Sequence, residues 1–311
     1  MLRQSDASVT YRRRVTHTVA GTLSPVQATS TRERSTEPPQ PSYRSWSRAF
    51  GDLRRGWHQR PLWGYLGWQD IKQGYNRSVI GPLWITISMA VTAFALGVLY
   101  STLFDQDLAV HLPYLTVGFI VWNFIAGNVN EGASVFIANE GLIKQLPAPL
   151  SVHVYRLVWR QMLFFAHNLV VYVILMFIFP KPLGFHSLMA VPAFAVLAIN
   201  AMWMAILVGI ISTRFRDIPP VTGSLMQLLF FMTPIVWNYD IIADRSEEVA
   251  AQLWVVELNP FMHFLEIIRQ PMLGEWASWH HWAIVGGITV VGWAAALVIL
   301  RNYRARVSYW V

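Results

Sequence analysis

The chain has 311 residues, of which 54% are hydrophobic and only 13% are charged, whereas a soluble globular domain carries about 25% charged residues. It contains no cysteine, which excludes disulfides, zinc–thiolate sites and thiol catalysis. The net charge of +7 does not indicate a nucleic-acid partner, because Lys and Arg flank long apolar runs, where they orient a membrane protein.

The first 45 residues are polar and rich in Ser, Thr, Arg and Pro, with three prolines between Glu37 and Pro41. Such a segment buries too little apolar area to offset the entropy lost on ordering. We therefore predict that residues 1–45 form a disordered cytoplasmic tail.

Residues 46–78 are predicted to form an amphipathic helix at the cytoplasmic membrane interface. A high content of Trp and Tyr is typical of helices that lie in this interface. Three glycines weaken the helix. Apolar side chains recur at spacings of three and four, at Leu62, Tyr65, Leu66, Trp68, Ile71 and Tyr75.

The rest of the chain, residues 79–311, is predicted to be a single transmembrane domain. It contains apolar runs that are each long enough to cross a bilayer, which takes about 20 residues. The fold class is therefore all-α, with six transmembrane helices at about 79–104, 108–135, 152–180, 184–213, 218–239 and 276–300.

The distribution of basic residues predicts the orientation of these six spans. With a cytoplasmic N-terminus, 21 of the 24 Lys and Arg residues fall on the cytoplasmic side and 3 on the outside. Positive residues collect in the cytoplasmic loops of membrane proteins. Both termini are therefore predicted to be cytoplasmic.

The segment 240–275 departs from a simple loop between spans, because it is acidic and also strongly apolar. Its two apolar halves meet at Asn259-Pro260, and both are too short to span. We predict two short helices that re-enter the outer leaflet against the bundle. The alternative is a pair of helices lying on the outer surface.

Five stretches, taken in order, carry a family resemblance: Asp70–Tyr75 with Arg77–Trp84, Asn139–Pro147, Arg214–Ile218, Thr233–Ile235, and Leu258–Phe261. From about Trp63 to the C-terminus, the chain resembles the membrane subunits of ABC-2-type exporters of polysaccharides such as O-antigen, capsule, teichoic acid or mycobacterial galactan. Gln73 and Gly74 depart from the family, in which basic residues are frequent at these positions.

The resemblance implies a homodimer that works with two copies of a separate ABC ATPase in the bacterial inner (plasma) membrane. ATP and Mg on that partner would drive a polyprenyl-diphosphate-linked glycan out of the cytoplasm. The sequence agrees with a separate ATPase, because a P-loop needs a Gly-Lys pair and none of Lys72, Lys144 and Lys181 follows a glycine. No cofactor, catalytic residue or metal site is therefore expected in this chain.

Two groups of residues are candidates for substrate contact. Arg77 and Lys72 lie just before the first span, where they either bind the diphosphate or anchor the chain at the membrane. Trp84, Tyr100, Phe230 and Phe231 either stack on sugar rings or pack against lipid and core. Glu131 is either a functional buried carboxylate or a solvated group at the cytoplasmic mouth.

Two cytoplasmic loops are candidates for contact with the ATPase. The first is a short coupling helix with Leu142 and Ile143 as apolar anchors, or else a simple connector. The second is either a smaller contact or a charged helix terminus. The residues concerned are Asn139, Glu140, Gly141, Leu142, Ile143 and Lys144 in the first loop, and Arg214, Phe215, Arg216 and Asp217 in the second.

Two alternative functions remain open. An ABC-2 permease for another lipid or a small molecule would share the fold and the ATPase. A membrane glycosyltransferase using polyprenyl-phosphate sugars would use Asp105 and Asp107 in the first external loop as base or metal ligands.

Overall fold

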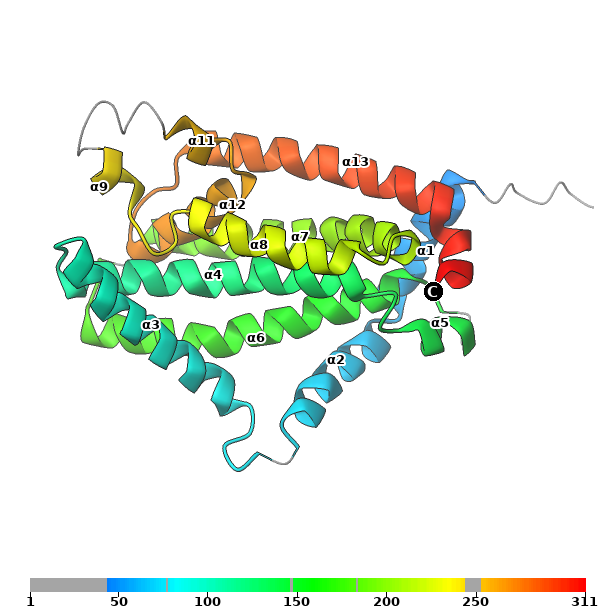
Figure 1. Ribbon diagram of the computed structural model, residues 1–311, viewed down its shortest axis with the longest axis horizontal. Coiled ribbons are helices and arrows are strands. Elements are labelled where there is room, and N and C mark those ends of the chain that lie inside the picture. Colours follow the sequence, from blue (N-terminus) through cyan, green and yellow to red (C-terminus); the bar gives the residue numbers. More distant parts are fainter. Residues whose placement is uncertain (1–43, 77, 146–147, 183, 244–252) are drawn as a thin grey trace, which may run out of the picture. The chain divides into compact units, whose positions relative to one another are not determined.

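The computed structural model describes residues 44–311 apart from 77, 146–147, 183 and 244–252. Most of the predicted N-terminal tail, and Arg77, therefore lie outside the described residues. The described part consists of helices joined by turns and loops (Figure 1). The helices are α1 Trp46–His58, α2 Arg60–Gly74, α3 Leu83–Leu103, α4 Leu108–Ser134, α5 Glu140–Gln145, α6 Ser151–Ile178, the 3-10 helix η1 Phe185–Met189, α7 Ala190–Arg214, α8 Ile218–Met232, α9 Tyr239–Ala243, α11 Trp254–Glu257, α12 Pro260–Leu273 and α13 Trp279–Trp310.

Within the described residues, five helices are long and apolar enough to cross a membrane: α3, α4, α6, η1 with α7, and α13. These five correspond to five of the six predicted spans. The remaining one, predicted at 218–239, is a helix that ends at Met232 after 15 residues. It ends there because Thr233 has extended backbone and Pro234 follows. A helix of this length reaches about 22 Å, less than the bilayer core of about 30 Å.

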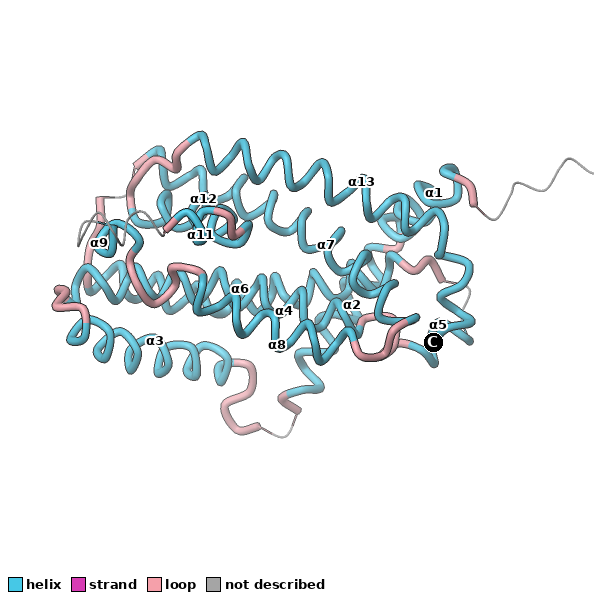
Figure 2. Tube along the Cα trace, turned by 45° about the horizontal axis from the view of Figure 1, so that its top comes forward, coloured by secondary structure: helices cyan, strands magenta, loops and turns pink. Residues whose placement is uncertain are grey.

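Helix α4 is the centre of the bundle and packs against α3, α6, α7, α8 and α12 (Figures 1 and 2). Most of its side chains are buried, whereas α3 is mostly exposed. Close approach of α4 and α7 depends on two glycines, since a Cβ on Gly209 would lie 2.9 Å from the carbonyl oxygen of Gly132. Small residues let helix backbones pack closely in a membrane protein.

The extensive contact between α13 and α7 includes a hydrogen bond between side chains and a close approach at a glycine. Asn200 Nδ2 donates to Thr289 Oγ1 at 2.8 Å, and both groups lie well inside apolar helices. Gly292 leaves room for the Trp203 ring, which a Cβ at that position would meet at 2.2 Å. Polar pairs of this kind join helices where no water is present to compete.

The predicted single amphipathic helix at 46–78 consists of two helices, separated at Gln59. Pro61 lies in the first turn of α2, where a backbone N–H would have no partner within the helix, so its absence costs nothing. In a helix that continued from α1, the same proline would remove a hydrogen bond and clash with the preceding turn. The first helix is fastened by Asp52, which is fully buried and accepts from the backbone N–H of Ser151 at 3.0 Å. The same carboxylate pairs with Arg304 at 2.7 Å, so Asp52 joins α1, α6 and α13.

The segment after α8 contains the predicted helix break. Asn259 is the N-cap of α12 and accepts from the Phe261 N–H at 3.0 Å. Its amide also donates to Thr233 Oγ1 at 2.8 Å, which ties the break to the end of α8. Helix α12 is almost entirely buried against α4, α7 and α13. The break at Asn259-Pro260 is thus present; the depth of the hairpin in a membrane stays a prediction.

The buried Arg269 secures α12 from inside. Its guanidinium donates to the Pro234 carbonyl at 2.6 Å, pairs with Glu266, and lies 3.9 Å from the centre of the Tyr114 ring. A cation that is only 1% exposed is costly unless it is paired and hydrogen-bonded, and here it is both.

The helices define two ends of the bundle. The α5 end comprises α1, α5 and the C-terminal turns of α13, and the α12 end comprises α9, α11 and α12 (Figure 1). Most described basic residues belong to the α5 end, including Arg156, Arg160, Arg216 and Arg304, whereas Lys181 and Arg269 belong to the α12 end. This separation of charge matches the pattern found in the sequence.

We predict that Asp52→Asn lowers the free energy of unfolding by about 1–3 kcal/mol, because the buried carboxylate loses its charge and Arg304 loses its partner. Thermal unfolding of the purified protein in detergent measures the change. Asp107→Asn is the matched control: Asp107 is an exposed N-cap of α4, and Asn caps helices as well as Asp, so its effect stays within about 0.5 kcal/mol. Equal effects of the two substitutions would contradict the role given to Asp52.

Candidate functional site

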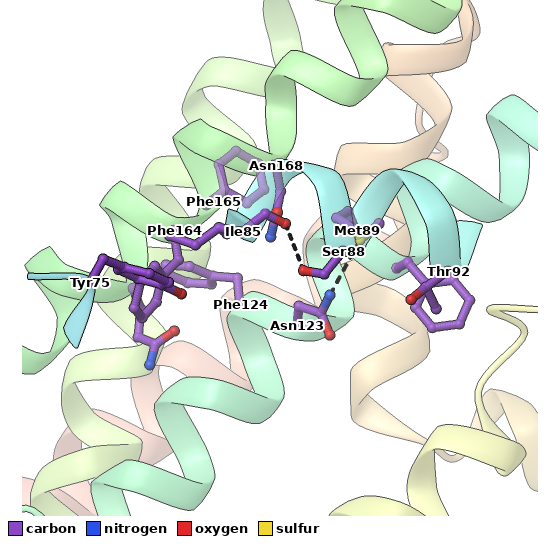
Figure 3. A pocket seen from close by; sticks show the side chains of 12 residues that line it. Tyr75, Ile85, Ser88, Met89, Thr92, Asn123, Phe124, Phe164, Phe165 and Asn168 are labelled. Carbon is purple, nitrogen blue, oxygen red and sulfur yellow. Dashed lines mark hydrogen bonds between the residues drawn. The ribbon is translucent and has the colours of Figure 1, made fainter. Parts of the chain in front are cut away.

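A groove of about 410 Å³ lies between α3, α4 and α6 (Figure 3). Its lining combines aromatic rings with hydroxyl and amide groups from these three helices and from the end of α2. The lining residues are Tyr75, Ile85, Ser88, Met89, Thr92, Phe119, Asn123, Phe124, Gln161, Phe164, Phe165 and Asn168.

Two amides among the residues that line the groove have unused hydrogen-bonding capacity. The buried Asn168 Oδ1 has no hydrogen-bond partner among the described residues. Asn123 is exposed near the middle of α4, and its amide donates to the Met89 sulfur at 3.5 Å (Figure 3). A thioether is a weak acceptor, so this amide retains most of its hydrogen-bonding capacity.

A network of ion pairs adjoins the groove at Gln161, which is part of both. Gln161 donates to Glu131 at 2.9 Å, and Glu131 pairs with Arg160. Arg160 also reaches Asp70 at 3.3 Å, and Arg156 binds the same carboxylate through two nitrogens, with Nε at 2.8 Å. A two-nitrogen contact fixes the relative orientation of the two side chains. The network therefore holds α2 against α4 and α6.

Close packing supports the same contact between α2 and α6. Gly67 faces α6 so closely that a Cβ would lie 2.8 Å from the Trp159 ring and 3.3 Å from the Arg156 carbonyl. Ile71, one turn later, is 2% exposed. Leu62, Tyr65 and Trp68, which belong to the same predicted apolar repeat, are instead exposed.

The predicted phosphate-binding residues, Lys72 and Arg77, flank Tyr75, a residue that lines the groove. Helix α2 ends at Gly74, and its C-cap Tyr75 lines the groove. Lys72 is exposed one turn before Tyr75. Arg77 follows Tyr75 by two residues and lies outside the described residues. Lys72 is therefore near the groove along the chain, but it is not one of the residues that line it.

The four predicted sugar-stacking residues do not line this groove. Trp84 and Phe231 are exposed on α3 and α8, at 53% and 60%. Tyr100 stacks on Phe104, with ring centres 5.8 Å apart. Phe230 packs against Phe119, which does line the groove, at 5.5 Å. The aromatic groups in the groove come instead from α4, α6 and Tyr75, which the sequence did not distinguish from core residues.

Glu131 is neither isolated nor simply solvated. Its side chain is 43% exposed and is paired with Arg160. The sequence missed this pairing, together with the roles of Asp70, Arg156 and Gln161. The only signal available was the presence of two arginines one helical turn apart at the start of an otherwise apolar segment, which orientation alone explains.

The acidic pair in the first external loop has a local structural role. Asp107 accepts from the Ala109 N–H at 2.9 Å and caps α4. Asp105 is exposed and has a positive φ of 54° in the turn before it. Helix capping therefore accounts for Asp107 without invoking catalysis.

The first predicted coupling loop forms helix α5, which contacts the C-terminal part of α13 (Figure 1). Leu142 is 38% exposed and Gly141 faces open space, whereas Ile143 packs against the core. Asn139, just before α5, donates to the Val135 carbonyl and accepts from Arg156 at 3.4 Å. The loop thus joins the ion-pair network on one side and exposes an apolar residue on the other.

The second predicted coupling loop lies close to the first. The hydrogen bond from Lys144, at 2.6 Å, lowers the pKa of Glu140, and the charges of Lys144 and Arg216 lower it further. Arg216 also donates to the Trp310 carbonyl at 3.1 Å, and Arg214 lies 5.9 Å from the Trp310 ring. Phe215 and Asp217 are exposed. The two loops and the C-terminal turn form one surface, which we call the coupling surface.

Comparison with known proteins identifies the family of this fold. A family model described as "ABC-2 type transporter" matches residues 61–273. Two permease proteins of Klebsiella pneumoniae, each named O-antigen export system permease protein RfbA, are 25% and 24% identical over 243 and 235 residues, covering 76% and 73% of this chain and 90% and 87% of the relatives. A protein of the same name from Myxococcus xanthus is 21% identical over 213 residues, covering 68% and 80%.

We predict that Gly67→Leu destabilises the protein by about 1–3 kcal/mol, because the new side chain is forced between α2 and α6. Thermal unfolding in detergent measures the loss. Gly64→Leu in the same helix is the control, since a Cβ there meets nothing within 4 Å. That change raises helix propensity by about 0.8 kcal/mol and is expected to be neutral or stabilising. Destabilisation by Gly64→Leu as large as that by Gly67→Leu would rule out the proposed close packing.

Proposed function

The chain belongs to the ABC-2 type transporter family, and we propose that it is the permease subunit of an ATP-driven exporter of a polyprenyl-diphosphate-linked polysaccharide. The similar proteins named as O-antigen export permeases support this substrate class. The observation that carries the proposal is that α3, α4 and α8 expose polar side chains near the middle of apolar helices.

Among these mid-helix polar groups, the amides of Asn123 and Gln227 are the ones poorly suited to contact with lipid, because Ser88 and Ser224 each donate to a carbonyl of their own helix. Ser88 and Thr92 on α3, Asn123 on α4, and Ser224 and Gln227 on α8 are all exposed. Both α3 and α8 pack against α4, so the three helices are neighbours. Polar side chains in a membrane segment generally face a water-filled path or another protein segment. We assign these groups to a conduit wall that a second copy of the chain completes.

The groove between α3, α4 and α6 matches the chemistry of a glycan. A sugar presents hydroxyls to amide and hydroxyl groups, and its apolar ring face to aromatic rings. Asn123, Asn168 and Gln161 provide the amides, and Phe164 and Phe165 are among the rings. Lys72 supplies positive charge for a lipid diphosphate, and Arg77, which lies outside the described residues, is the second candidate from the sequence. In this proposal Trp84, Tyr100, Phe230 and Phe231 contact sugar further along the conduit.

The proposed assembly contains two copies of this chain and two copies of an ABC ATPase. The coupling surface is where the ATPase docks, with Leu142 and Phe215 as the exposed apolar anchors. This arrangement requires the α5 end and both termini to be cytoplasmic, in the bacterial inner (plasma) membrane. The excess of Lys and Arg at the α5 end favours this orientation. The short α8 then lines the conduit as a sixth membrane segment, and α11 with α12 forms the re-entrant hairpin on the outside.

We predict that Leu142→Asp abolishes stable association with the cognate ATPase and its ATP-dependent export. A charge replaces an apolar anchor at the contact, whereas folding is unaffected because Leu142 is partly exposed. Co-purification of the two subunits and ATPase activity of the complex measure the effect, and Leu142→Met serves as the control that retains the contact. Normal co-purification and export with Leu142→Asp would eliminate α5 as the docking element.

We predict that Asn168→Leu reduces export of lipid-linked glycan by about tenfold, the effect of one lost hydrogen bond to the substrate. Its stability is expected to be unchanged or higher, because a buried amide oxygen without a partner is removed. Export is measured as surface glycan in cells that depend on this permease. Val170→Leu, at an exposed position on the same helix, is the control.

Parallel loss of stability and export in Asn168→Leu would mean that Asn168 acts only in folding. A complex that is active in ATP hydrolysis, fails to export lipid-linked glycan, and exports another lipid or a small molecule would favour the alternative ABC-2 function over glycan export.

A further inference from the structure

Three histidines meet at the α12 end, on the opposite side of the bundle from the coupling surface. We propose that His263, His280 and His281 form a binding site for a transition-metal ion, Zn²⁺ being the ion that the ligand set favours. One coordinating nitrogen from each residue lies within 4.8 Å of the others. His263 belongs to α12, whereas His280 and His281 lie in the first turn of α13.

The surroundings of His263 hold its ring ready for coordination. Its Nε2 lies 2.8 Å from the Glu257 carbonyl oxygen, which only accepts hydrogen bonds, so Nε2 carries the hydrogen. In the neutral ring, Nδ1 is then the acceptor, and without metal it accepts a hydrogen bond from His281 Nδ1–H at 2.7 Å; a bound ion would take the place of that hydrogen. A backbone carbonyl on the second ring nitrogen is the usual support of a metal-binding histidine.

The arrangement of the three rings leaves space for a shared ion. The ring centres of His263 lie 5.6 Å and 5.0 Å from those of His280 and His281, and the latter two are 5.5 Å apart. The site borders a cavity of about 370 Å³. His280 is exposed, so an ion and a water ligand in the fourth position have access from solvent.

Two nearby carboxylates, Glu257 and Glu266, already have partners, and the three imidazoles are the ligands that come together. Glu266 pairs with Arg269, and Glu257 accepts from the Tyr239 hydroxyl at 2.8 Å. An all-nitrogen set favours Zn²⁺ over Ca²⁺ and Mg²⁺, which prefer oxygen. Three histidines with an open fourth position are a known zinc arrangement. Bound metal would clamp α12 to the start of α13.

This proposal departs from the expectation that the chain holds no metal. It does not depend on the transported substrate, because the ligands lie at the α12 end and outside the groove between α3, α4 and α6. Failure of the metal-site proposal would therefore leave the proposed export function intact, and failure of the export proposal would leave the metal site intact.

The test uses the full chain, purified in detergent through an affinity tag without histidine and stripped of metal with EDTA. Titration with Zn²⁺ alone is expected to show one ion per chain and a rise in the unfolding temperature. His280→Ala and His263→Gln are each expected to weaken binding by at least tenfold, by analogy with the effect of losing a supporting ligand partner. His58→Ala removes an exposed imidazole at the α5 end and is expected to leave binding unchanged.

Two controls keep the test decisive. Because His280 is exposed, His280→Ala is expected to unfold at the wild-type temperature in EDTA, which separates lost binding from lost folding. Co²⁺ bound to the wild-type chain is expected to give the visible absorption of a tetrahedral nitrogen site. Absence of stoichiometric Zn²⁺ binding, absence of the Co²⁺ spectrum, or equal weakening by His58→Ala would overturn the proposal.

Discussion

The carboxylate of Asp70 and the two arginines of α6 form the contact on which the arrangement of the candidate site depends. Charged groups between packed helices are stable only when they are paired, and Arg156 and Arg160 have Asp70 and Glu131 as partners. Because the four residues come from α2, α4 and α6, their pairing fixes how α2 crosses the bundle. That path determines where Tyr75 meets the groove and where the chain turns into α3.

Buried charges also need partners at the two ends of the bundle, and different groups supply them there. At the α5 end, Asp52 is satisfied by backbone N–H groups and by Arg304. At the α12 end, Arg269 is satisfied by a carbonyl, a carboxylate and an aromatic ring. Both ends are thus tied by buried polar contacts, whereas α3 and α8 have few buried residues. A permease whose conduit is completed by a second subunit would need this division between a tied frame and an open wall.

The break between α11 and α12 illustrates how far local sequence signals reach. Asn259 followed by Pro260 is a strong helix-start signal, and Asn259 does cap α12. This local signal does not predict which residue the Asn259 side chain will contact, however. Its amide donates to Thr233, 26 residues away. In the same way, Pro234 is visible in the sequence, but its apolar surroundings concealed the end of α8 at Met232. The helix break between α1 and α2 lies at Gln59, just before the apolar repeat that starts at Leu62, and the prediction of one helix over 46–78 passed over it.

The sequence by itself determined that this is an all-α membrane protein, and it located five of its long helices and their family, because apolar runs and helix signals are local properties of the chain. Only the tertiary structure decided which charges pair, which side chains line the groove, and that His263 meets two histidines of α13. Such contacts join residues far apart in the chain, 86 positions in the case of Asp70 and Arg156. They depend on the angles and rotations at which helices pack, and apolar periodicity alone does not specify either.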